Sequence, residues 1–115
     1  MVAELNEQDF ESTLAASHGP VLVDFAAVWC HPCRIQAPVI ESLAAESAGR
    51  YAVYTLDVDR APAIARRYGV RSVPTLIVFR DGEERQRLTG YQSAATLRAA
   101  LDAAAASPAT AAEAT

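Results

Sequence analysis

The residues best suited to chemistry form one short segment, Trp29-Cys30-His31-Pro32-Cys33, which contains both cysteines of the 115-residue chain. The segment follows an apolar run, residues 21–27, that is typical of a buried strand. A dithiol with this spacing, where a strand passes into a helix, can close a disulfide within one helical turn and expose one sulfur to a partner. The segment therefore predicts thiol–disulfide exchange.

A second candidate is Asp24, the one charged residue inside the apolar run. Removing a carboxylate from water usually raises its pKa toward the range that is useful for proton transfer. The alternative is a core carboxylate that is satisfied by hydrogen bonds or an ion pair, as most buried polar groups are. The residues alone leave both interpretations open.

The cysteines could instead be half of a zinc site. Four ligands would then require both His18 and His31, and His31 lies inside the Cys-x-x-Cys loop. This arrangement disfavours a structural metal, so we expect none.

Composition narrows the classes of partner and compartment. The net charge is -4 and every basic residue is Arg, without a basic block, so we expect no nucleic-acid partner. No apolar run approaches the roughly 18 residues of a membrane span, and the first five residues lack the basic and apolar regions of a signal peptide. We therefore expect a cytoplasmic protein without a membrane partner. Structural disulfides are rare in reducing compartments, so a lone Cys-x-x-Cys pair there favours redox or metal chemistry.

Periodicity and turn residues predict the elements that position these side chains. The first expected helix covers about residues 6–18, with Asn6 as its cap. The second covers about residues 32–47, with an apolar face of Ile35, Val39 and Leu43 and a kink at Pro38. A third covers about residues 59–69 with Asp59 as its cap, and a last helix is capped by Ser93. The expected strands cover residues 21–27, 51–58, 73–79 and 83–89, with a hairpin turn at Asp81-Gly82, a polar edge strand after it and a break at Gly90.

This order of strands and helices indicates βαβ units followed by an antiparallel pair. It predicts a mixed sheet with helices on both faces, in which sites form at the carboxyl ends of strands, where Cys30 lies. From Ala103 onward the composition is Ala, Ser, Pro and Thr with one Glu, which predicts a frayed tail. We expect one domain over residues 1–104 and a disordered Ala-rich tail over residues 105–115.

Taken together, these motifs resemble those of the thioredoxin family, over about Leu5 to Ala104. The resemblance rests on an ordered set: Val23-Asp24-Phe25, Trp29-Cys30-x-Pro32-Cys33, Ala37-Pro38, Val73-Pro74-Thr75, and Asp81-Gly82 with Gly90. It implies an α/β protein with the thioredoxin fold, a central mixed sheet of four to five strands flanked by helices on both faces.

The resemblance also implies roles for the catalytic residues. Cys30 would be the exposed nucleophile, Cys33 the more buried resolving cysteine, and Asp24 the group that takes the proton from Cys33. The physics agrees for Cys30, because a helix N-terminus favours a thiolate. Cys33 lies one turn away, so its attack is intramolecular and has a large effective concentration.

Further implied residues concern substrate binding. By resemblance, Pro74 is cis and its loop packs against the cysteines, leaving the Val73 backbone free to pair with an extended substrate. Trp29 and Gly90, with Val28 and Ala26, would form a flat apolar rim; ordinary packing is the alternative for Trp29.

Ala26 and Val28 depart from the family pattern in the rim, and two further departures lie close to the catalytic residues. Thr55 stands where thioredoxins commonly have a Lys near the buried Asp, so we expect Asp24 to titrate higher than in a typical thioredoxin. His31 stands where Gly is usual, and a protonated imidazole beside Cys30 would stabilise the thiolate. The helix dipole opposes this, but over a longer range, so we expect a potential less negative than the thioredoxin value of about -270 mV. A solvated, inert loop histidine is the alternative.

The implied function is that of a monomeric protein-disulfide reductase. Its only redox group would be the Cys30-Cys33 disulfide, and a thioredoxin-reductase-like donor would regenerate it. Two alternatives stay open: a more oxidising isomerase or oxidase tuned by His31, and a binding or chaperone module of thioredoxin fold whose dithiol is incidental.

Overall fold

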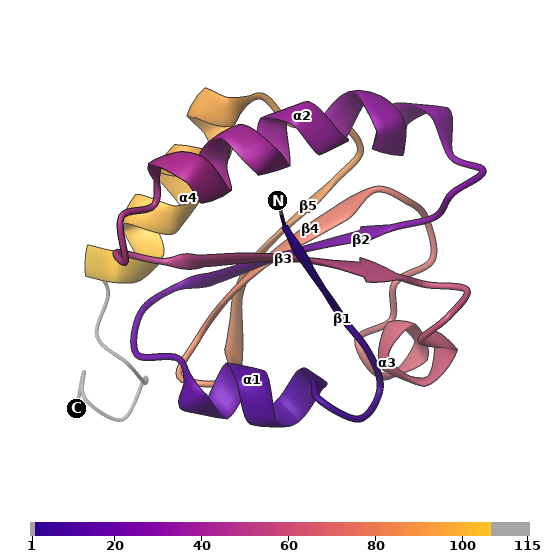
Figure 1. Ribbon diagram of the computed structural model, residues 1–115, viewed down its shortest axis with the longest axis horizontal. Helices are drawn as coiled ribbons and strands as arrows, with labels where there is room; N and C mark the ends of the chain where they lie inside the picture. The colour runs from indigo at the N-terminus through magenta and orange to yellow at the C-terminus, as the bar shows by residue number, and fades with distance from the viewer. Residues whose placement is uncertain (1, 107–115) are drawn as a thin grey trace.

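The computed structural model describes residues 2–106, in which strands and helices alternate along the chain before a hairpin and a final helix (Figure 1). The elements are β1 (Ala3–Leu5), α1 (Phe10–Ala16), β2 (Val21–Ala26), α2 (His31–Glu46), β3 (Ala52–Asp57), α3 (Pro62–Arg67), β4 (Thr75–Arg80), β5 (Glu83–Thr89) and α4 (Ala94–Ala106). No helix in this part of the chain is both long and apolar enough to cross a membrane.

The strands form one mixed sheet in the order β1-β3-β2-β4-β5. The strands β1, β3 and β2 are parallel, whereas β4 is antiparallel to β2 and β5 is antiparallel to β4. In Figure 1, α2 and α4 lie on one face of the sheet and α1 and α3 on the other. The α/β class and the thioredoxin-type architecture are therefore confirmed.

β2 is the central strand, and its continuous apolar sequence follows from cover on both faces. Val23 and Phe25 pack into one core cluster with α1 and α3 residues, and Leu22 packs into the other with residues of α2 and α4. Successive side chains of a strand alternate between its faces. Asp24 therefore lies on the face that α2 covers, close to the cysteines that follow the strand.

The predicted apolar face of α2 is wrong in part. Ile35 is 51% exposed, and the buried residues of the helix are Cys33, Gln36, Ile40 and Leu43. A strict four-residue spacing drifts around a helix of 3.6 residues per turn, whereas alternating steps of three and four stay on one face. The position that the pattern missed is occupied by a polar residue, Gln36.

One expected helix cap, Asp59, is wrong, whereas Asn6 makes the bonds of a cap in the turn that precedes α1. Asn6 Oδ1 accepts from the N–H groups of Gln8 and Asp9, both at 2.9 Å, although α1 itself begins at Phe10. Asp59 does not cap α3; instead, Glu7 Oε2 accepts from Ala63 N–H at 2.8 Å across 56 residues of sequence. The remaining cap is confirmed, since Thr96 N–H donates to Ser93 Oγ at 3.2 Å.

Helix α4 extends beyond the point at which the composition predicts a tail. Residues 103–106 are helical because Ala104 is buried and Arg80 Nη1 donates to the carbonyl oxygens of Ala104 and Ala105, at 2.8 and 2.7 Å. The rest of the predicted tail, residues 107–115, lies outside the described residues. At the other end, β1 has only three residues, too few for the sequence to predict its bounds.

Candidate active site

The cysteines lie where β2 passes into α2. Cys30 is the N-cap residue of α2, and its Sγ accepts from Cys33 N–H at 3.2 Å, as a capping side chain does. His31 and Pro32 follow in the first turn, where a proline costs no helical hydrogen bond. Cys30 and Cys33 are joined by a disulfide.

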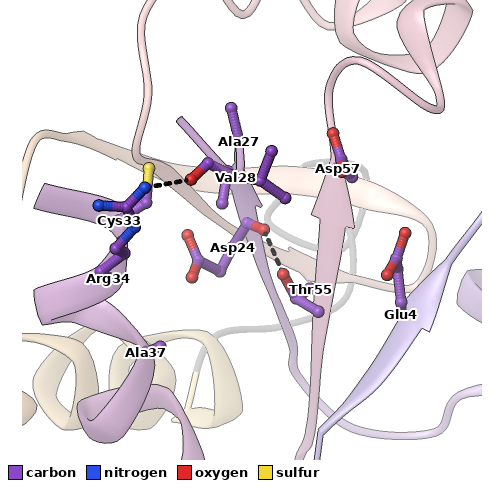
Figure 2. A pocket seen from close by; sticks show the side chains of 10 residues that line it. Glu4, Asp24, Ala27, Val28, Cys33, Arg34, Ala37, Thr55 and Asp57 are labelled. Carbon is purple, nitrogen blue, oxygen red and sulfur yellow. Dashed lines mark hydrogen bonds between the residues drawn. The ribbon is translucent and has the colours of Figure 1, made fainter. Parts of the chain in front are cut away.

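Exposure does not distinguish the two cysteines, contrary to the expectation of an exposed Cys30. Cys30 is 4% exposed and Cys33 is 5% exposed, because both pack into a small cluster with Ala27 and with Val73 from the loop before β4. Their surroundings do differ. Cys30 Sγ lies 3.5 Å from the carbonyl oxygen of Val73, whereas Cys33 lines a cavity that also holds Asp24 (Figure 2).

The cavity has a volume of about 220 Å³ and is lined by both the buried carboxyl of Asp24 and Cys33. Asp24 is 3% exposed, and its Oδ1 has no hydrogen-bond partner among residues 2–106. Thr55, its register partner on β3, donates to the backbone oxygen of Asp24 at 3.3 Å and not to its carboxylate. Burial raises the pKa of Asp24 from 3.8 to about 7. The satisfied core carboxylate is therefore not what the structure shows.

Charged side chains around the cavity do not offset this burial. Arg34 lines it, but its Nη2 donates to the backbone oxygen of Val28 at 2.9 Å, as the dashed line in Figure 2 shows. Glu4 also lines the cavity and forms an ion pair with Arg60 at 3.4 Å. Asp57 adds a further carboxylate. Desolvation thus dominates the pKa of Asp24, because the one cation among the lining residues is directed to a carbonyl.

The loop before β4 closes the site on the side of Cys30. The Val73-Pro74 peptide bond is cis. The carbonyl oxygen of Pro74 accepts from Gly90 N–H at 2.8 Å, and Thr75 Oγ1 donates to the carbonyl oxygen of Ser72 at 2.7 Å. Gly90 has a φ of 85°, a conformation that glycine adopts without the strain of a side chain. The sequence therefore brings Val73, Pro74 and Gly90 together next to the disulfide.

An exposed apolar rim adjoins these residues. Val28 is 74% and Trp29 64% exposed, so ordinary core packing does not account for Trp29. Its Nε1 donates to Asp59 Oδ2 at 2.7 Å, which holds the indole at the surface. A groove of about 120 Å³ lies between Trp29 and the loop that carries Val73.

The two histidines, which were the other candidate metal ligands, lie on different parts of the fold. His31 is exposed on the first turn of α2, and His18 is exposed in the bend between α1 and β2. Within residues 2–106, no group of three or more His, Cys, Asp or Glu side chains is placed to hold a metal ion.

Sequence reasoning missed two residues that hold the site together. Asp59 was expected at a helix cap, and only the folded chain shows its bond to Trp29, thirty positions earlier. Gln36 is completely buried and bonded to the backbone of Gln92. Its position three residues after Cys33, on the same helix face, was the available signal.

Comparison with known proteins agrees with this geometry. A family model described as thioredoxin matches residues 1–103. The thioredoxin of Staphylococcus aureus is 43% identical over 101 residues, which are 88% of this chain and 95% of that protein. The chloroplastic M-type thioredoxin of Spinacia oleracea is 41% identical over 101 residues, which are 88% of this chain and 56% of that protein. The chloroplastic M-type thioredoxin of Pisum sativum is 43% identical over 96 residues, which are 84% of this chain and 56% of that protein. The chain thus spans about half the length of these chloroplast relatives. The chain belongs to the thioredoxin family.

Proposed function

We propose that this protein is a thiol–disulfide oxidoreductase that reduces disulfides in other proteins. One observation carries the proposal: the Cys30-Cys33 disulfide caps the N-terminus of α2 and lies beside the unpartnered carboxyl oxygen of Asp24. A nucleophile, a resolving thiol and a proton acceptor are then within one turn of a helix and one strand end.

In the first step, the thiolate of reduced Cys30 attacks one sulfur of a substrate disulfide. A mixed disulfide forms, and the second substrate sulfur leaves as a thiolate. The N–H of Cys33, which donates to Cys30 Sγ, and the positive end of the α2 dipole favour the thiolate form of Cys30. Cys30 is the attacking group because its sulfur occupies the cap position.

In the second step, Cys33 resolves the mixed disulfide. Asp24 takes the proton of the Cys33 thiol, and the resulting thiolate attacks Cys30 Sγ. The Cys30-Cys33 disulfide forms, and the substrate leaves with both sulfurs reduced. A pKa of about 7 suits this transfer at neutral pH, since the group then exists in both protonation states. Two electrons from a partner reductase return the protein to its dithiol form, and no bound cofactor is needed.

Substrate contact is proposed at the surface around the disulfide. The backbone of Val73 would pair with an extended substrate segment, and Trp29, Pro74 and Gly90 would border it. The partners proposed are protein disulfides and a thioredoxin-reductase-like electron donor, with the protein acting as a monomer in the cytoplasm and without nucleic-acid or membrane partners.

Reduction of insulin disulfides tests the activity, and two matched variants test the roles of the cysteines. We expect Cys30→Ser and Cys33→Ser both to abolish turnover. Cys33→Ser retains the nucleophile and should accumulate a mixed disulfide with the substrate, whereas Cys30→Ser should not. A dithiol-independent rate would instead support the scaffold alternative, and trapping by Cys30→Ser alone would reverse the two roles.

A second candidate function is a more oxidising isomerase or oxidase. It is favoured by one observation, the exposed His31 directly after Cys30 at the start of α2. A protonated imidazole there would stabilise the Cys30 thiolate and with it the reduced protein. The redox potential of a His31 variant separates this function from that of a reductase.

A further inference from the structure

Gln36 is the one completely buried polar side chain on α2. It is 0% exposed, and its amide makes two hydrogen bonds to the backbone of a single residue. Nε2 donates to the Gln92 carbonyl oxygen at 3.0 Å, and Oε1 accepts from Gln92 N–H at 2.7 Å. The side chain therefore satisfies the backbone of Gln92 in both directions, as a neighbouring strand would.

Further contacts connect this segment, residues 90–92, to the disulfide. The Gln92 side chain donates to the carbonyl oxygens of Thr89 and Gly90, at 3.2 and 3.3 Å. Gly90 N–H donates to the Pro74 carbonyl oxygen at 2.8 Å. The residue before Pro74 is Val73, whose carbonyl oxygen lies 3.5 Å from Cys30 Sγ. Contacts thus run from α2 through the 90–92 segment and the Pro74 loop to Cys30, the N-cap residue of the same helix.

Packing alone does not account for an amide at this position. An apolar side chain of similar volume would fill the same space on the buried face of α2, beside Ile40 and Leu43. It would leave the Gln92 N–H and carbonyl oxygen without these partners, and unpaired backbone groups away from water are costly. The amide also fixes the position of the 90–92 segment, because both hydrogen bonds form at only one placement of that segment against α2.

We propose that Gln36 is a positioning residue that sets the affinity for protein substrates by holding Gly90 and the Pro74 loop in place. This rests on the proposed function. Gly90 and Val73 border the docking surface, and the next residue, Tyr91, is 47% exposed. A surface that is ordered before binding loses less freedom when a substrate docks. Gln36 touches neither sulfur in these contacts, so it acts on docking and not on the exchange chemistry.

The test compares Gln36→Met with the unsubstituted protein and with a control variant, Ile40→Val, whose substitution lies on the same buried face of α2. For Gln36→Met, we expect KM for insulin to rise about three- to tenfold with little change in kcat. The rate with a small disulfide, hydroxyethyl disulfide, and the equilibrium with glutathione should stay within twofold. Amide hydrogen exchange at Gln92 and Gly90 should accelerate at least about tenfold. Gln36→Glu keeps an acceptor for Gln92 N–H and should give an intermediate KM.

Four results would overturn the proposal. Unchanged exchange at Gln92 would show that the side chain does not hold the segment. Faster exchange with an unchanged insulin KM would show that the segment does not serve docking. Equal losses with insulin and with the small disulfide, or a KM effect matched by Ile40→Val, would show a general disturbance of the fold. Failure of the proposed function is distinguishable, because the unsubstituted protein would then lack Cys30-dependent insulin reduction while the exchange measurement still reports on the contact.

Discussion

The substitution Asp24→Asn should stabilise the protein, and by an amount that depends on pH. Asn has nearly the shape of Asp but carries no ionisable group. Asp24 is buried on the central strand, and no cation around its cavity pairs with it among the described residues. Its pKa rises from 3.8 to about 7 for that reason. The folded protein therefore binds this proton more tightly than the unfolded chain does.

The size and sign follow from the two pKa values. The stabilising contribution of the neutral carboxyl is complete below the unfolded-state pKa of 3.8 and is lost as the pH rises to about 7. Each pH unit over that window costs about 1.4 kcal/mol, so the full loss is about 4 kcal/mol. Above pH 7 the loss stays constant. The Asn variant does not undergo this loss. Its free energy of unfolding should exceed that of the wild type by about 4 kcal/mol above pH 7, and by little near pH 4.

Urea unfolding of both oxidised proteins between pH 4 and pH 9 measures this difference. The disulfide stays closed, so no thiol titrates during the experiment. Glu41→Gln is the control, because it removes one exposed carboxyl from α2 and should change the unfolding free energy by no more than about 0.5 kcal/mol. A difference between wild type and Asp24→Asn that does not grow with pH would refute the reasoning, since burial of a charge is its only source.

Three further changes test other contacts. His31→Gly should make the redox potential more negative, because it removes an imidazole that would stabilise the Cys30 thiolate; equilibration with glutathione measures this, and equal potentials would contradict it. Arg80→Met should lower the unfolding free energy by about 1–3 kcal/mol, since it removes both charged hydrogen bonds to the end of α4; a urea midpoint equal to that of wild type would count against this. Trp29→Phe removes the bond to Asp59 but keeps an aromatic ring, so stability should change by less than about 1 kcal/mol while KM for insulin rises; an unchanged KM would remove Trp29 from the docking surface.

Most of the fold could be predicted because its signals are local. The apolar run that became β2 indicates cover on both faces, and Asp81-Gly82 indicates a hairpin turn, where the structure has φ of 55° and 77°. The edge strand β5 was predicted with its observed bounds. The short strand β1 was not, because three residues with two exposed side chains carry no usable period.

The site was predictable where it lies on a motif and not where it depends on distant contacts. Cys30, Cys33 and Asp24 share one strand-to-helix segment, so their types and spacing sufficed to predict that they lie close together, whereas their separate roles were implied by the family resemblance. The bonds of Asp59 to Trp29 and of Gln36 to Gln92 join residues 30 and 56 positions apart. Hydrophobic periodicity assigns polar residues to the surface, which is why it placed Ile35 in the core and passed over Gln36.

The stability cost of Asp24 bears on why a carboxyl stands at this position. A cost of about 4 kcal/mol above pH 7 is a large share of the 5–15 kcal/mol that holds most domains folded. Asn would fit the same space on β2 without that cost but could not take up a proton. Thr55 has a hydroxyl within reach of the strand, yet it bonds the backbone oxygen of Asp24 and leaves the carboxyl without that stabilising donor. The proton transfer with Cys33 that we propose requires an ionisable group such as this carboxyl, and the same unrelieved burial that lowers stability places its pKa near neutrality.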